Sequence, residues 1–201
     1  MPAVALAVSR MEGEKMNNFK VPEQQDLKYQ WEIAKARISE WLQSQVFHYK
    51  WWILLALFSI SAILLWKKAD KSRIVELTIY TAIVVFFIIV LDELGLELTL
   101  WYYPVDIIPL FPPATAINIS CLPLVYMVIY QRYGTWGKFL IATLIMAAIF
   151  CFVFEPVFVW GGIYTMLKWK SYYGLPIYFA IAVAAKLLVN IIYSKKAKRN
   201  S

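Results

Sequence analysis

Five polar residues lie inside or at the ends of strongly apolar segments, where their side chains could handle protons or cations. They are Asp92, Asn118, Glu155, Lys186 and Asn190, and Glu155 lies within the sequence FCFVFEPVFVW. A charged side chain near the centre of a bilayer costs about 3 kcal/mol or more, so such residues face the protein interior and often mark a functional site. Two interpretations of these residues stand: a functional polar cluster, and paired packing groups that fix the register of helices.

A second set of candidate residues lies in the segment LDELGLELTLWYYPVDIIPLFPP, residues 91–113. This segment has four carboxylates and four prolines but no lysine or arginine. The absence of bases is typical of an external loop, and the prolines exclude one continuous helix. The segment is therefore either a surface loop or a re-entrant loop that dips into the bilayer edge. Its candidate outer-loop site comprises Trp101, Tyr102, Tyr103 and Asp106.

The composition indicates the fold class that must position these residues. Of the residues, 61% are hydrophobic and 16% are charged, whereas soluble domains average about 45–50% apolar and about 25% charged. A helix needs about 20 apolar residues to cross about 30 Å of hydrocarbon. The sequence predicts an all-α polytopic membrane helix bundle over residues 46–194, with about five transmembrane helices. The spans are expected near 47–66, 74–96, 115–130, 139–164 and 175–193, and the third is short and contains Pro123.

Distances along these spans place several of the polar side chains at one level of the bilayer. A helix rises about 1.5 Å per residue, so Asp92, Asn118 and Glu155 fall in the same outer third of the predicted bundle. Lys186 lies near the middle of the last span, from which it could reach Glu155 and form a buried pair. Asn190 lies one helical turn further along, on the same face as Lys186.

The distribution of lysine and arginine predicts the orientation of the bundle. Ten of these bases lie near the inner ends of the five spans or in the tail at 195–201, against five on the other side. This asymmetry favours a cytoplasmic C-terminus and an external N-terminus. The lysines and arginines are clustered between apolar segments and do not form a continuous basic surface that could follow a nucleic-acid backbone. The sequence therefore does not indicate nucleic-acid binding.

The N-terminal region differs in pattern from the predicted bundle. Residues 1–22 are expected to be unstructured, and residues 23–45 to form an amphipathic helix. Its apolar stripe has spacings of three and four and consists of Leu27, Trp31, Ala34, Ile38 and Trp41. Such a helix either lies on the lipid headgroups or binds a partner, through a protein contact or self-association.

Several short motifs resemble those of a known group of proteins. They are W-Y-x-P and P-L-F-P within 91–113, Y-x-x-x-Y-Q at 126–131 and E-P at 155–156. In these motifs the chain resembles, over about residues 74–190, a family of small multi-pass membrane proteins from Bacillus- and Paenibacillus-like bacteria. The resemblance implies an integral protein of a bacterial cytoplasmic membrane. It implies no activity, and it assigns no catalytic residue.

Three functions remain open from the sequence. The favoured one is an accessory or structural membrane protein that acts through partners or the lipid bilayer. The second is a small proton- or cation-linked transporter that uses the polar cluster. The third is an intramembrane enzyme on a lipid or isoprenoid, with two carboxylates as acid and base. Because no catalytic or metal-binding motif is evident, the sequence favours a non-enzyme with no cofactor and no metal.

Overall fold

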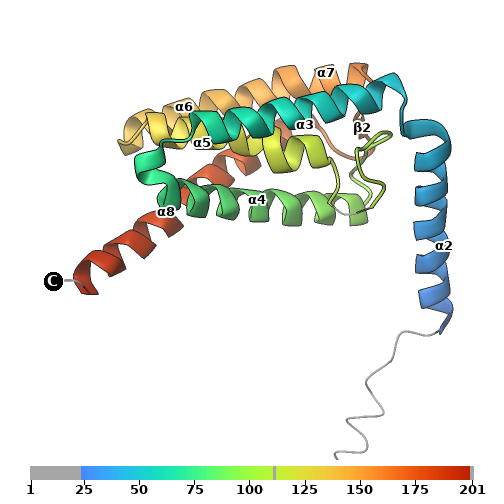
Figure 1. Cartoon of the computed structure of the whole chain (residues 1–201), viewed down its shortest axis with the longest axis horizontal. Helices are drawn as coiled ribbons and strands as arrows, with labels where there is room; N and C mark the ends of the chain where they lie inside the picture. The colour runs from blue at the N-terminus through green and yellow to red at the C-terminus, as the bar shows by residue number, and fades with distance from the viewer. Residues whose placement is uncertain (1–23, 111, 200–201) are drawn as a thin grey trace, which may run out of the picture. The chain divides into compact units, whose positions relative to one another are not determined.

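The computed structural model describes residues 24–110 and 112–199, and these residues form an all-α fold, as the sequence predicts (Figure 1). The predicted unstructured start at 1–22 lies outside the described residues. The main helices are α2 (Gln24–Glu40), α3 (Tyr49–Lys68), α4 (Ile74–Glu97), α5 (Leu122–Arg132), α6 (Trp136–Ile149), α7 (Glu155–Trp160) and α8 (Gly174–Arg199). The short elements are the π-helical turns η1 (Trp41–Gln45), η3 (Ile117–Cys121) and η4 (Phe150–Phe154), the 3-10 turns η2 (Lys71–Arg73) and η5 (Ser171–Tyr173), and the strands β1 (Trp101–Tyr102) and β2 (Thr165–Met166).

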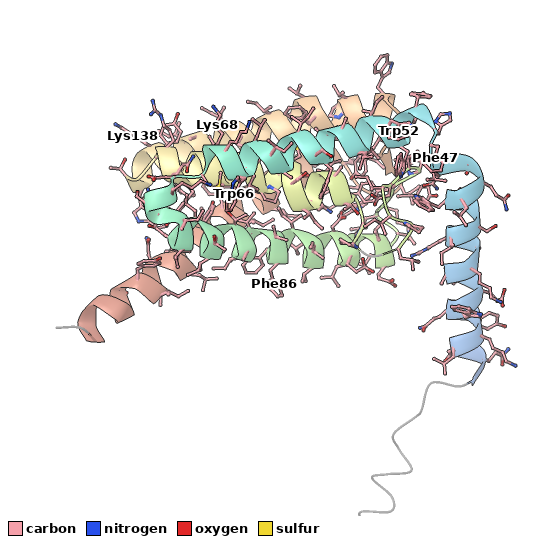
Figure 2. All side chains as sticks on the ribbon, in the orientation of Figure 1. Phe47, Trp52, Trp66, Lys68, Phe86 and Lys138 are labelled. Atoms are coloured by element: carbon pink, nitrogen blue, oxygen red, sulfur yellow. The ribbon has the colours of Figure 1, made fainter. Side chains whose placement is uncertain are left out.

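Four helical segments of the described chain are long and apolar enough to cross a membrane. They are Tyr49–Lys68, Lys71–Glu97, Trp136–Trp160 and Ser171–Ser194. Only 11–33% of each apolar stretch is buried inside the protein, so most of its surface needs an apolar solvent. Phe86 and Trp66 are 61% and 67% exposed, and their side chains project from α4 and α3 (Figure 2). These helices give the chain a membrane location.

The third predicted span is helical and lies in the interior of the bundle. Residues 115–132 form eighteen consecutive helical residues, or about 27 Å, against about 30 Å of hydrocarbon. The helix α5 packs against α3, α4 and α6, and Tyr126 and Met127 are each 1% exposed. This segment therefore forms the centre of the bundle, beside the four described segments that have the length and composition of membrane spans.

The buried face of α4 fixes where its polar residue points. The buried residues recur at spacings of three and four, as one face of a helix requires, and they are Leu77, Tyr80, Val84, Ile88, Asp92 and Gly95. Near the start of this face the Tyr80 ring stacks on that of Tyr130, with 3.9 Å between the ring centroids. Asp92 continues an apolar stripe, so its carboxylate faces the interior of the bundle.

A tight motif ends α4 and starts the loop that closes the bundle. The Leu100 N–H donates to the Gly95 carbonyl at 2.9 Å, and the Thr99 N–H donates to the Leu96 carbonyl at 2.9 Å. Thr99 has the left-handed conformation that this motif needs, with φ of 52°. The chain then turns back to form β1, which pairs antiparallel with β2 so that Trp101 lies opposite Met166. We refer to this end of the bundle, where α4 ends and α8 begins, as the cavity end.

Helix α2 forms a separate unit, and the bundle begins at Trp41. The apolar side chains of Leu27 and Trp31 are 52% and 59% exposed. Lys35 forms an ion pair with Glu32 at 3.2 Å on the same helix. Of the predicted stripe, Trp41 belongs to the bundle, where its Nε1 donates to the Asp106 carbonyl at 3.1 Å.

Candidate functional site

A cavity of about 320 Å³ lies inside the cavity end of the bundle. Its wall is formed by α4, by the η3–α5 and η4–α7 segments, and by the start of α8, while the loops that carry β1 and β2 close it. Ligand pockets in proteins have volumes of about 300–1,000 Å³ and mostly apolar walls with a few polar groups. The polar residues at this wall include Asp92, Asn118, Glu155, Tyr103, Tyr164 and Tyr178.

Asp92 accepts hydrogen bonds from three side chains that the chain brings from different segments. Oδ1 accepts from the Trp101 Nε1 at 2.9 Å and from the Tyr103 hydroxyl at 2.7 Å. Oδ2 accepts from the Asn118 Nδ2 at 2.7 Å. A buried carboxylate with three donors is compensated for its loss of hydration. Asp92 thus anchors the loop after α4 and the η3 turn to one helix.

Two glycines at the cavity end allow close approaches that a larger side chain would block. At Gly95, a Cβ atom would overlap the indole ring of Trp101. The bare helix surface therefore lets the indole cross α4 and reach Asp92. At Gly174, a Cβ atom would lie 3.1 Å from the Cys151 Sγ and 3.1 Å from Oε1 of Glu155.

Asn118 and Glu155 are each presented next to a π-helical turn. Asn118 lies within η3, whose Leu122 N–H bonds to the Ile117 carbonyl, and Glu155 directly follows η4, where its own N–H bonds to the Phe150 carbonyl. In both helices a proline follows the turn, at position 123 and position 156. Proline lacks the N–H that a regular helix needs, and such irregular turns are often found at functional sites. These widened turns place Asn118 and Glu155 at the cavity wall.

Glu155 is the polar group of the wall whose hydrogen bonding is incomplete. Its side chain is only 6% exposed, and Oε1 accepts from the Tyr178 hydroxyl at 3.0 Å. Oε2 is buried and has no hydrogen-bond partner among the described residues. A buried carboxylate oxygen without a donor carries an uncompensated desolvation cost of about 1–3 kcal/mol or more. This oxygen distinguishes Glu155 from Asp92.

Two tyrosines in the closing loops connect the region of Asp92 with that of Glu155. The rings of Tyr103 and Tyr164 are 5.5 Å apart between centroids, and both residues line the cavity. Burial raises the pKa of the Tyr103 hydroxyl well above its ordinary value, and the charge of Asp92 raises it further. Burial likewise raises the pKa of Tyr164. Both hydroxyls therefore stay protonated at neutral pH.

Lys186 and Asn190 do not join these residues, which corrects the expected pair of Lys186 with Glu155. The Lys186 Nζ donates to the carbonyls of Tyr133 and Gly134 at 3.2 Å and 3.0 Å. It also lies 4.0 Å from the centre of the Phe139 ring. These carbonyls follow α5 at the end of the bundle opposite the cavity, so Lys186 caps a helix. Asn190 is exposed on α8.

The structure separates the four residues of the predicted outer-loop site. Trp101 and Tyr103 bind Asp92, and Tyr102 is exposed on strand β1. Asp106 is not among the residues that line the cavity. Its Oδ1 bridges two backbone segments, because it accepts from the N–H groups of Ile107 at 2.7 Å and Thr115 at 3.1 Å. Burial of the carboxyl group raises the pKa of Asp106 to about 6.

Tyr164 and Tyr178 were not predicted from the sequence as site residues. Tyr178 lies one turn into the last predicted span. Its distance along the helix puts it at the same depth as Glu155, and this shared depth could have identified it as a site residue. Tyr164 lies in a loop, where no periodic pattern marks it. No family model, curated protein or solved structure matches this chain.

Proposed function

We propose that this chain is an accessory membrane protein that binds a lipophilic small molecule in the cavity between α4 and α8. The observation that carries the proposal is a mostly apolar cavity of about 320 Å³ with a carboxylate at its wall that has no partner for one oxygen. We further propose a bacterial cytoplasmic membrane with the C-terminus in the cytoplasm, on the basis of the lysine and arginine distribution and the resemblance.

The residues at the rim of the cavity support a ligand that arrives from the bilayer. Three of the residues that line it, Leu91, Leu94 and Leu98, are 37%, 52% and 63% exposed. All three lie on α4 or at its end, and their exposed surface is apolar. These leucines extend the apolar lining of the cavity to the exposed surface of α4, which we propose as the entry route for a lipophilic molecule.

The hydrogen bonds of the two carboxylates support binding over catalysis. General acid–base chemistry needs two groups that are free to exchange protons with a substrate. Asp92 is held by three donors, which makes it a structural anchor. Glu155 remains as a single group that can accept a hydrogen bond from a ligand.

The placement of the other polar residues also favours a binding site over a route through the bundle. Lys186 lies at the opposite end of the bundle from the cavity. Between the two lie the buried Tyr80, Val84 and Tyr126, each at most 1% exposed. The helix α2, with its exposed Leu27 and Trp31, is proposed to attach to lipid headgroups or a partner protein.

The test is photolabelling of the protein in phosphatidylcholine nanodiscs with a neutral alkyl diazirine. Ile88 and Leu122 line the cavity and are 5% and 3% exposed, so a probe in the cavity should label both. The variant Ile177→Trp fills the cavity and should abolish that labelling. Ile192→Trp is the matched control, because Ile192 lies on the same helix and is 45% exposed.

Two outcomes would contradict the proposal. One is labelling that is confined to lipid-facing residues such as Phe86. The other is equal labelling of Ile88 and Leu122 in the Ile177→Trp and Ile192→Trp variants, which would show that the probe reaches these residues by another route.

A further inference from the structure

We propose that the ligand carries a protonated amine on an apolar body, and that Glu155 binds this ammonium group. The inference rests on the proposed function, and it adds the chemical class of the ligand. It comes from three features of the cavity: its charges, its aromatic rings and the free oxygen of Glu155.

The charged residues that line the cavity are all acidic. They are Asp92 and Glu155, and no lysine, arginine or histidine is among the described residues that line it. Lys168 lies in the closing loop, but it is exposed and its Nζ donates to the Thr99 hydroxyl at 2.9 Å. Since charges interact strongly in a low-dielectric interior, an anionic ligand such as a fatty acid or a phospholipid headgroup would be repelled.

Aromatic rings surround the two carboxylates on several sides. Trp101 and Trp169 make an edge contact with 4.9 Å between ring centroids, and both line the cavity together with Tyr164 and Phe158. The faces of aromatic rings attract cations, most strongly when water is absent. An apolar body also gains from burial against these rings. The wall therefore complements a cation that is mostly apolar.

The unpartnered oxygen of Glu155 gives the ammonium group a specific position. An N–H donor of the ligand at Oε2 would complete the hydrogen bonding of the carboxylate, whose Oε1 already accepts from Tyr178. A charge-assisted bond of this kind is about twice as strong as a bond between neutral groups. A neutral alcohol would supply a donor but no charge, so its affinity should be lower.

The experiment compares three probes with one chain length and different head groups: decylammonium, decanol and decanoate. Each displaces the neutral alkyl diazirine from the native protein in phosphatidylcholine nanodiscs, and empty nanodiscs correct for partition into lipid. Decylammonium is expected to bind about tenfold more tightly than decanol, and decanoate more weakly than both.

The Glu155→Gln variant should lower the affinity for decylammonium by about tenfold while decanol binds within about twofold of its native affinity. Glu97→Gln is the control, because Glu97 is exposed at the end of α4 and does not line the cavity. Retained decanol binding shows that Glu155→Gln folds with its cavity intact. The comparison of head groups on the native protein needs no variant.

The possible results separate the two proposals. If all three probes displace the diazirine equally, or decanoate binds best, the cavity binds ligands but the ammonium inference is wrong. An equal loss of decanol and decylammonium in Glu155→Gln would also overturn it. If the diazirine itself does not label Ile88 and Leu122 in the native protein, the proposed function fails.

Discussion

The contact between Gly95 and Trp101 gives the sharpest stability prediction. A Cβ atom at position 95 would overlap the indole ring, so Gly95→Ala must displace Trp101 and break its bond to Asp92. Overpacking costs about 1–3 kcal/mol, and the lost bond to a carboxylate costs about 1.5–3 kcal/mol. The higher helix propensity of alanine offsets about 1 kcal/mol of this loss in the free energy of unfolding. The expected net loss in the free energy of unfolding is about 2–5 kcal/mol.

The assay is equilibrium unfolding in mixed micelles of rising sodium dodecyl sulfate fraction, followed by circular dichroism. The matched control is Gly137→Ala in α6, where an added Cβ would meet nothing within 4 Å. This control should leave the free energy of unfolding unchanged or raise it by about 1 kcal/mol. In a Trp101→Ala background, Gly95→Ala should no longer destabilise, because the overlap is gone.

Equal effects of Gly95→Ala and Gly137→Ala would refute this account of the cavity end. So would a Gly95→Ala penalty that persists unchanged in the Trp101→Ala background. Either result would mean that the indole does not cross α4 at Gly95 on its way to Asp92.

Two further predictions concern residues outside the cavity. Lys186→Met removes the donor to the Tyr133 and Gly134 carbonyls. Both residues are exposed, so water can hydrate the freed carbonyls, and the free energy of unfolding should fall by only about 1–2 kcal/mol while diazirine labelling of the cavity persists. Loss of labelling with unchanged stability would contradict the capping role. Burial raises the pKa of Asp106 from 3.8 to about 6. Between these two pH values the native state binds more protons than the unfolded state, so the free energy of unfolding falls as the pH rises. Relative to Asp106→Asn, the free energy of unfolding should fall by about 2 kcal/mol between about pH 4 and about pH 6. Parallel pH curves for the two proteins would contradict this prediction.

The position of Asp92 could be predicted from the sequence, and its partners only in part. The buried stripe of α4 has helical spacing, and distance along the helix places Asp92 near the level of Asn118. The structure joins these two side chains by a hydrogen bond of 2.7 Å. The bonds from Trp101 and Tyr103 depend on how the loop folds back over Gly95, and no periodic pattern encodes that path.

The direction of Lys186 could not be predicted for a related physical reason. Helical spacing places Lys186 beside Ala182 and Ala185, on the buried face of α8. Spacing does not say which way a long, flexible side chain extends along the helix axis. The carbonyls at Tyr133 and Gly134 determine that direction, and they belong to a turn. The role of Asp106 as a bridge between two backbone segments likewise depends on loop geometry.

The most direct measurement of the account is the distance between the nitrogen of bound decylammonium and the Glu155 carboxylate. Solid-state NMR dephasing between ¹⁵N-labelled decylammonium and ¹³C-labelled glutamate side chains measures it in nanodiscs, with Glu155→Gln to assign the signal. We expect a separation of about 3.5 Å between the nitrogen and the carboxyl carbon, which corresponds to a charge-assisted hydrogen bond of about 2.8 Å between nitrogen and oxygen. Dephasing that is unchanged in Glu155→Gln, or contact of the nitrogen with lipid phosphate alone, would contradict the account.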